Sequence, residues 1–166
     1  MPLLKHGTIT DDPWVHVANA EDLPTGLPAI ISLDRWQAER DALIARKEAL
    51  GIRLESHQPP SLIRDDLDRF ALVALNFPKF ADGRAYSHAR LLKERYDFAG
   101  EVRATGDVLR DQYRFLHRCG FDALEVSDAE AAAAWKEALG EFRHDYQPAA
   151  RGAETVLRRR HRRQAA

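Results

Sequence analysis

The sequence is poor in cysteine: Cys119 is the single one among 166 residues. One thiol can form neither a disulfide within the chain nor a four-thiolate metal site. Cys119 falls on the apolar side of an expected helix, next to Gly120, and this position predicts a buried, unreactive thiol. A chain without disulfides is typical of a reducing cytoplasm, which is the location we expect.

Long apolar runs and excess charge are also missing. No apolar run approaches the ~20 residues that a membrane-spanning helix needs, and the first residues, MPLLKHGTITDDPW, lack the apolar core of a signal peptide. The net charge of -1 gives no overall field that would favour nucleic acid or a membrane surface. We therefore expect neither partner. The run RRRHRR at 158–163 predicts a flexible, solvated tail, with an anionic partner as the alternative.

Motifs of common cofactors and nucleophiles are absent as well. Neither G-x-G-x-x-G nor G-x-x-x-x-G-K-[ST] nor G-x-S-x-G occurs in the sequence. The 7 histidines show no paired ligand spacing, so we expect no metal site. His88 and His117 fall within expected helices and are interpreted as surface or packing residues. The sequence thus names no cofactor and leaves open whether the protein is an enzyme.

What the chain does contain is a repeated strand–helix pattern. Apolar residues make up 45% and charged residues 31%, as in an ordinary soluble domain of this length. Short apolar runs predict strands near residues 29, 52, 70, 101 and 121, each followed by a helical pattern. The run from Phe70 to Leu75 is the strongest strand signal, because a continuous apolar run suits a parallel strand covered on both faces.

This repeat predicts an α/β fold with about five βα units and a mostly parallel sheet that carries helices on both faces. An open sandwich is favoured, since five units are too few to close an eightfold barrel, and a partial barrel is the alternative. We place the single domain at residues 29–147, after an N-terminal extension at 1–28 and before a basic, flexible tail at 148–166. Strand order and oligomeric state are not predicted.

Some element boundaries have recognisable signals. A helix is expected from Leu33 to Leu50, capped by Ser32 or Asp34 and ended by Gly51. Another is expected to begin at Asp107. Residues 127–130 match a capping box, S-x-x-E, and residues 141–146 are interpreted as a last strand or an extended arm.

Polar and basic residues are concentrated in two strand-to-helix turns, KFADGR at 79–84 and RATGD at 103–107. In parallel α/β folds, ligands bind beyond the carboxyl ends of the strands. Cationic side chains there, with turn glycines that expose backbone N–H groups, predict a site for a small anion such as sulfate, sulfite, phosphate or a carboxylate. The expected ligand-binding residues are Lys79, Arg84, Ser87, Arg103 and Gly106.

Acid or base roles have three candidates, Asp82, Asp107 and Asp111. The same residues also have an ordinary structural interpretation. Asp107 can cap its helix, Asp82 and Gly83 can form a simple turn, and the cations can pair with Asp82 or Glu101. Convergence of Lys79, Arg84, Arg103 and Asp107 on one cleft would favour the ligand site.

The stretch from residue 77 to 126 resembles an uncharacterised bacterial family of about this length. The family pattern is F-P-K-F-x-D-G-R-x-Y-S-x-A-R-L-L, then G-E-(L/V)-R-A-x-G-D-V-L-x-D-Q, then R-x-G-F-D. The chain matches this pattern at 77–80, 82–84, 86–87, 89–92, 100–104, 106–109, 111–112, 118 and 120–122. Asn76 stands where many members carry glutamate.

Members of that family are described as an oxidoreductase involved in sulfite reduction and are encoded near sulfite reductase genes. The resemblance therefore implies a role in assimilatory sulfate reduction. Two functions follow as expectations. One is an accessory protein that binds a small anion or docks to sulfite reductase or another sulfate-assimilation enzyme. The other is an enzyme, an oxidoreductase or transferase, that acts on a small anionic or phosphorylated ligand in the 76–112 site.

Overall fold

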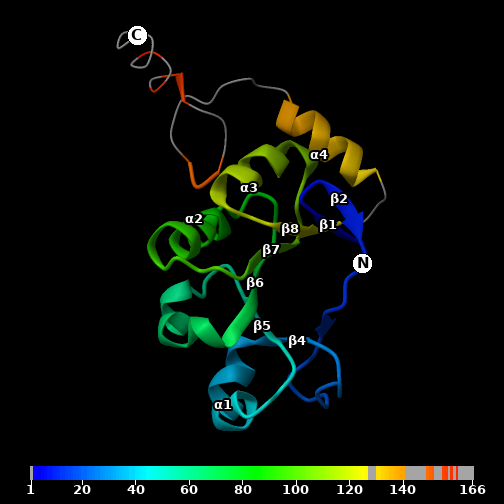
Figure 1. Cartoon of the computed structure of the whole chain (residues 1–166), viewed down its shortest axis with the longest axis vertical. Coiled ribbons are helices and arrows are strands. Elements are labelled where there is room, and N and C mark those ends of the chain that lie inside the picture. The colour runs from blue at the N-terminus through cyan, green and yellow to red at the C-terminus, as the bar shows by residue number, and fades with distance from the viewer. Residues whose placement is uncertain are drawn as a thin grey trace.

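The computed structural model describes residues 2–126, 130–140, 149–151, 155, 156, 158 and 160, and in this part of the chain eight strands form one sheet (Figure 1). The strands are β1 (Leu3–Lys5), β2 (Thr8–Thr10), β3 (Val15–His16), β4 (Ala29–Ser32), β5 (Leu50–Leu54), β6 (Phe70–Phe77), β7 (Glu101–Gly106) and β8 (Ala123–Glu125). Their order is β2-β1-β8-β7-β6-β5-β4-β3. Neighbours from β3 to β8 are parallel, and β1 is antiparallel to β2 and β8. A mixed α/β fold with a mostly parallel sheet is thus confirmed.

A helical segment follows each strand from β4 to β8. These segments are α1 (Leu33–Ile44), the 3₁₀ helix η1 (Pro60–Arg69), α2 (Arg84–Arg90) with its π-helical continuation η2 (Leu91–Arg95), the 3₁₀ turn η3 (Arg110–Gln112) with α3 (Tyr113–Cys119), and α4 (Ala131–Gly140). The predicted cap of α1 is confirmed, because the Ser32 hydroxyl accepts a hydrogen bond from Arg35 N. The helix ends at Ile44, earlier than predicted, and Gly51 belongs to β5.

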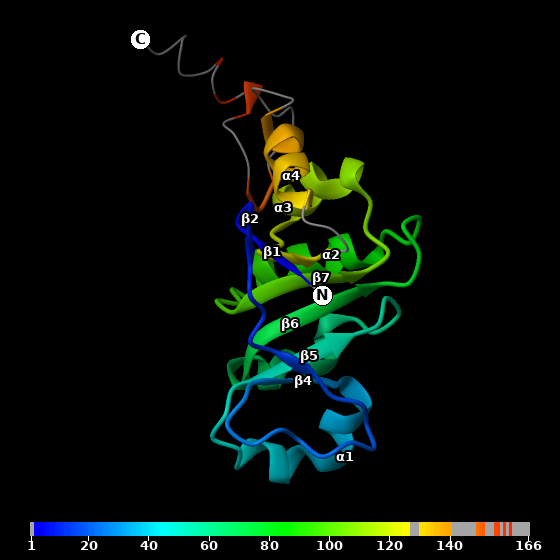
Figure 2. The same ribbon diagram turned by 90° about the vertical axis from the view of Figure 1, so that its right-hand side faces the viewer.

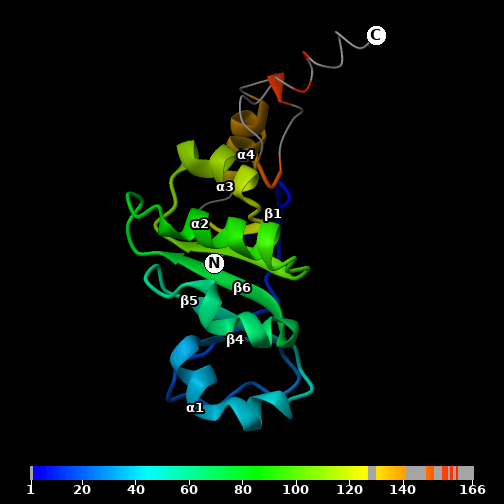
Figure 3. The ribbon, with the colours of Figure 1, turned by 90° about the vertical axis from the view of Figure 1, so that its left-hand side faces the viewer.

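The helices lie on one face of the sheet. Strands β4 to β8 are neighbours in chain order, and right-handed crossovers that always advance in one direction place every helix on the same side. Figure 3 shows α1, α2 and α3 together in front of the strands. The prediction of helices on both faces of an open sandwich is therefore wrong. The sheet instead curls into a half-barrel, as the partial-barrel alternative expected, with the helices outside.

N-terminal residues cross the inner face of this half-barrel (Figure 2). The β1–β2 hairpin pairs with β8 at one edge of the sheet, and β3 pairs with β4 at the other. Residues 11–14, here called the strap, connect the two edges. Residues 1–28, predicted to be an extension, thus supply three strands of the same sheet. The strap residue Trp14 packs against Ile30, Leu72 and Ala74.

Side chains alternate between the two faces of each strand. On β6, Val73, Leu75 and Phe77 belong to the main apolar core under the helices. The inner face is different. On β5, β7 and β8, polar or charged residues alternate along the strand with the residues that face the core, so they lie on the inner face. The inner face therefore holds buried charge, most clearly at Arg103, which is 0% exposed.

Among the described residues, no helix is long and apolar enough to cross a membrane. Three of the four positions of the predicted capping box, the predicted strand or arm at 141–146, and most of the RRRHRR run lie outside these residues.

Candidate functional site

The two turns singled out in the sequence lie against each other at the carboxyl ends of β6 and β7. Asp107 N donates a hydrogen bond to the Phe77 carbonyl at 2.8 Å, and Phe80 N donates to Asp107 Oδ2 at 3.0 Å. The Asp107 carboxylate therefore holds the neighbouring turn. It does not cap a helix, and the helical segment predicted to begin at Asp107 begins at Arg110.

Gln112 fastens the turns a second time. Its Nε2 donates to the Phe80 carbonyl at 2.8 Å, and its Oε1 accepts from Leu109 N at 3.0 Å. The two residues that Gln112 contacts have exposed apolar side chains: Phe80 is 52% exposed and Leu109 is 41% exposed. On α3, Phe115 is 49% exposed, and its ring lies 4.6 Å from that of Tyr86. Phe80, Leu109 and Phe115 are called the paired-turn surface below.

Gly106 makes this close approach possible. Its φ of +89° is a backbone conformation that residues with a side chain rarely adopt. A Cβ atom added at this position would also lie 2.3 Å from the Phe77 carbonyl oxygen. The predicted importance of Gly106 thus has a structural basis in the contact between the turns. Whether its N–H also binds an anion stays a prediction.

The charges of the first turn are largely paired with each other. Arg84 contacts Asp82 at 2.6 Å and donates to the Ser56 hydroxyl at 2.9 Å. Hydrogen bonds from Arg84 and Ser56 hold the pKa of Asp82 far below its ordinary value, so this carboxylate stays ionised at neutral pH. This is the pairing that the structural interpretation predicted. Lys79 and Ser87 are exposed, and Lys79 has no ion pair within the described residues.

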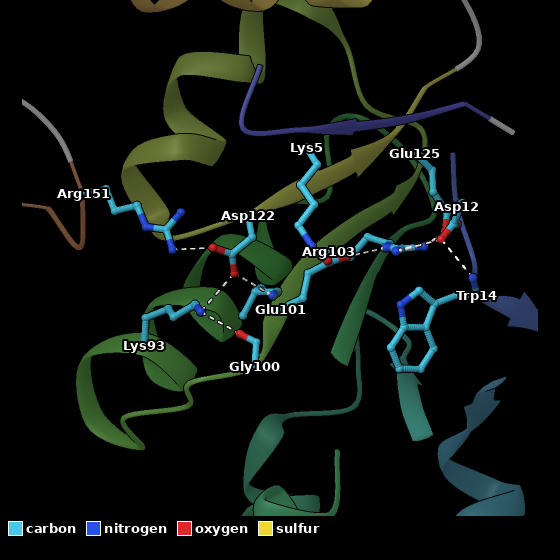
Figure 4. A network of polar contacts seen from close by, with 11 residues as sticks. Lys5, Asp12, Trp14, Lys93, Gly100, Glu101, Arg103, Asp122, Glu125 and Arg151 are labelled. Carbon is cyan, nitrogen blue, oxygen red and sulfur yellow. Dashed lines mark hydrogen bonds and ion pairs between the residues drawn. The ribbon is translucent and has the colours of Figure 1, made fainter. Parts of the chain in front are cut away.

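Arg103, predicted to join the same anion site, lies on the inner face of the sheet. Its side chain is 0% exposed and contacts Asp12 of the strap at 2.6 Å, Glu101 at 2.9 Å and Glu125 at 3.4 Å. Burial by itself lowers the pKa of Arg103, but Asp12 and Glu101 outweigh that effect and raise the pKa above its ordinary value. The guanidinium therefore remains charged and joins the strap to β7 and β8 (Figure 4).

This inner-face network extends through two further contacts. Lys5 Nζ lies 2.6 Å from Glu101 Oε2, and His16 Nε2 lies 2.7 Å from Glu125 Oε1. Burial acts to raise the pKa of Glu125, but His16 and Arg103 together hold the pKa below its ordinary value. His16 is thus oriented by a half-buried carboxylate, a role that spacing along the sequence did not reveal.

A separate network surrounds the buried carboxylate of Asp122 (Figure 4). Asp122 Oδ2 accepts from Val102 N at 2.8 Å and lies 3.0 Å from Lys93 Nζ, while Oδ1 contacts the guanidinium of Arg151. Burial raises the pKa of Asp122, but these hydrogen bonds overcome it and lower the pKa. Asp122 therefore ties a residue of the predicted tail to the sheet and to η2.

The predicted site residues are thus divided among different partners. Asp107 and Gly106 join the two turns, Arg84 is paired with Asp82, and Arg103 is held on the inner face. In the described part of the chain, the two guanidiniums share no hydrogen-bonding partner. Asp111 is exposed within η3. Their roles in ligand binding or catalysis stay predictions.

Other polar candidates have mainly structural surroundings. Burial raises the pKa of the Cys119 thiol to about 11, which confirms a buried thiol of low reactivity. His117 packs edge-on against Trp135 at 5.8 Å. Asn76 is buried and donates to Glu55 Oε2 at 2.6 Å. Within the described residues, no group of three or more His, Cys, Asp or Glu side chains is arranged to hold a metal ion.

Comparison with known proteins gives a family and no curated relative. No curated protein matches the chain. Residues 51–157, from β5 into the C-terminal segment, match the model of a family described as "Bacterial protein of unknown function (DUF934)". The match contains both turns and Arg103, and it confirms the expectation of an uncharacterised bacterial family. The chain belongs to this DUF934 family of bacterial proteins.

Proposed function

We propose that the protein is an accessory protein of assimilatory sulfate and sulfite reduction, which docks through the paired-turn surface to sulfite reductase or another enzyme of that process. The biological context comes from the family resemblance of residues 77–126. The structural support is one observation: Phe80 is 52% exposed although hydrogen bonds at its N–H and its carbonyl fix its backbone.

Such an arrangement suits recognition of a protein. Aromatic side chains are enriched at the centres of protein interfaces, where a few of them carry most of the binding energy. A backbone that is already fixed loses little conformational entropy on binding. The nearby charged groups, Lys79 and Arg110, would lie at the rim of such an interface, where polar residues set orientation and association rate.

Replacing Phe80 with alanine is expected to weaken binding to the partner about thirtyfold, the effect of removing one strong interface residue. Affinity purification from a host that carries the sulfate-assimilation enzymes, followed by quantification of sulfite reductase, measures the loss. Leu62→Ala is the matched control, because Leu62 is 51% exposed and belongs to η1, not to either turn. Equal recovery with both variants, together with normal sulfite reduction in a strain that lacks the protein, would contradict the proposal.

The alternative function is an enzyme, or a carrier, that holds a small anionic or phosphorylated ligand at the first turn. It is favoured by the exposure of Lys79 and Arg84 within one short segment. If it is correct, sulfite, sulfate or phosphate should raise the melting temperature, and Arg84→Ala should weaken that binding about tenfold. Arg90→Ala is the control, since Arg90 is also exposed and also paired, with Glu94 at 3.0 Å. An unchanged anion response in Arg84→Ala would remove this site.

A further inference from the structure

A cavity of about 470 Å³ lies at the carboxyl ends of β4 and β5, between these strands, His16 at the end of β3 and the residues that follow it, 17–21. The volume is in the range of small-molecule sites. Ligands of parallel α/β sheets bind at this end of the strands. The cavity is separate from the paired-turn surface, whose three residues do not line it.

Arg53 of β5 is the main cation in the lining. Its side chain is 41% exposed, and one terminal nitrogen contacts Glu55 Oε1 at 3.1 Å. The Nε atom, in contrast, is buried and has no hydrogen-bond partner within the described residues. An atom this buried is not reached from the cavity, so a ligand there would contact the exposed terminal nitrogens of the guanidinium. A guanidinium with free donors binds carboxylates and related oxyanions well.

Carboxylates line the same cavity, from three different elements of the chain. Glu55 comes directly after β5, Glu21 belongs to the segment that follows β3, and Asp34 lies at the start of α1. A purely anionic ligand would be repelled by these carboxylates, and a purely cationic ligand would leave Arg53 without a new partner. A small molecule that carries both charges satisfies both sets of groups.

We propose that this cavity binds a small zwitterion of the amino-acid class. The ligand carboxylate is bound by Arg53, and its ammonium group lies toward Glu55 and the other carboxylates. Gln58 also lines the cavity, and its side-chain oxygen is already used by Glu55 N at 2.9 Å, which leaves its amide NH₂ available for the ligand. The site requires no contribution from the paired-turn surface.

Thermal-shift measurements and titration calorimetry with the standard amino acids test the proposal on the isolated protein. Each amino acid is compared with the acid that lacks the amino group and the amine that lacks the carboxylate. At least one amino acid should bind in the micromolar to millimolar range, and both truncated compounds should bind more weakly. Absence of binding by every amino acid, or equal binding of a truncated compound, would overturn the proposal.

Two variants identify the site. Arg53→Gln should weaken amino-acid binding at least about tenfold, because it removes a charge-assisted hydrogen bond. Glu55→Gln should weaken the amino acid but leave the truncated acid unchanged or better bound, so it gives an independent result if the first variant folds poorly. Arg69→Gln is the control, as Arg69 is exposed outside the cavity and lies 3.7 Å from Asp68. Wild-type affinity in both cavity variants would place the ligand elsewhere and refute the assignment.

Discussion

Replacing Arg103 with leucine is expected to lower the free energy of unfolding by about 3–5 kcal/mol, the typical cost of removing one partner from a buried ion-pair network. The fully buried guanidinium contacts the carboxylates of Asp12, Glu101 and Glu125. Leucine would leave these carboxylates with Lys5 and His16 as their remaining cationic partners among the described residues. Urea unfolding at neutral pH measures the difference. Arg90→Leu, at an exposed pair, should change stability by no more than about 0.5 kcal/mol.

The difference in the free energy of unfolding between the wild-type protein and Arg103→Leu should become smaller as the pH falls. In the wild-type protein the pKa of Glu125 is lowered, so its contribution to stability is complete above the ordinary glutamate pKa and is lost as the pH falls through the lowered value. In the variant, burial acts on Glu125 without the guanidinium, and protonation relieves the unpaired charge. A difference that stays constant from neutral pH to below about 4.3, the ordinary pKa of glutamate, would contradict this electrostatic explanation.

Replacing Asp122 with alanine is expected to cost about 3 kcal/mol, since it leaves a buried N–H of Val102 and two cations, Lys93 and Arg151, without their shared acceptor. Chemical denaturation measures the loss, and the rate of trypsin cleavage after Arg151 should rise because that side chain loses its carboxylate partner and, among the described residues, keeps only the Phe121 carbonyl. Asp68→Ala is the control, because the Asp68 side chain is 73% exposed.

The same residue gives a second pH test. The pKa of Asp122 is lowered in the folded protein, so its stabilisation is present above the ordinary aspartate pKa of about 3.9 and disappears as the pH falls through the lowered value. Wild-type protein and Asp122→Ala should therefore converge in stability in acid. Unchanged cleavage after Arg151 at neutral pH would show that other contacts hold the C-terminal segment.

The parallel strands were predictable because each is a short apolar run between turn signals. Phe70–Phe77 is the longest of them, and its core position under the helices follows from the continuous apolar run at 70–75. The β1–β2 hairpin was missed. Its turn is His6-Gly7, with φ values of 50° and 82°, and a histidine in the left-handed region is a weak turn signal compared with asparagine or aspartate. The helix predicted after β4 is longer than α1, because Leu50 fits the end of a helix as well as the start of a strand and Gly51 fits a helix end as well as a strand.

The layer arrangement depends on strand order, which local patterns do not contain. Once β4 to β8 are known to be sequential, helices on one face follow from the handedness of the crossovers. The sequence predicted that both turns lie at the carboxyl ends of the strands, and it did not predict which residues join them. Gln112, which adds a further connection from the first turn to Leu109, gave no signal beyond its place in the family pattern.

Arg103 shows why the predicted anion site was only partly located. Its position before the turn suggested a place at the ligand, but it faces inward on β7, opposite the strap. The alternation in G-I-R-L-E at 51–55 and E-V-R-A-T at 101–105 contained the needed signal, because charged residues every second position share one face. Partners such as Asp12 and His16 are far away in the sequence, and only the fold brings them to that face.

The proposed docking function is tested most directly by the affinity between purified sulfite reductase and this protein, measured by calorimetry for wild type, Phe80→Ala and Leu62→Ala. We predict binding by the wild type and by Leu62→Ala with equal affinity, and about thirtyfold weaker binding by Phe80→Ala. Failure of the wild-type protein to bind, or equal binding by all three, would contradict docking to sulfite reductase through the paired-turn surface.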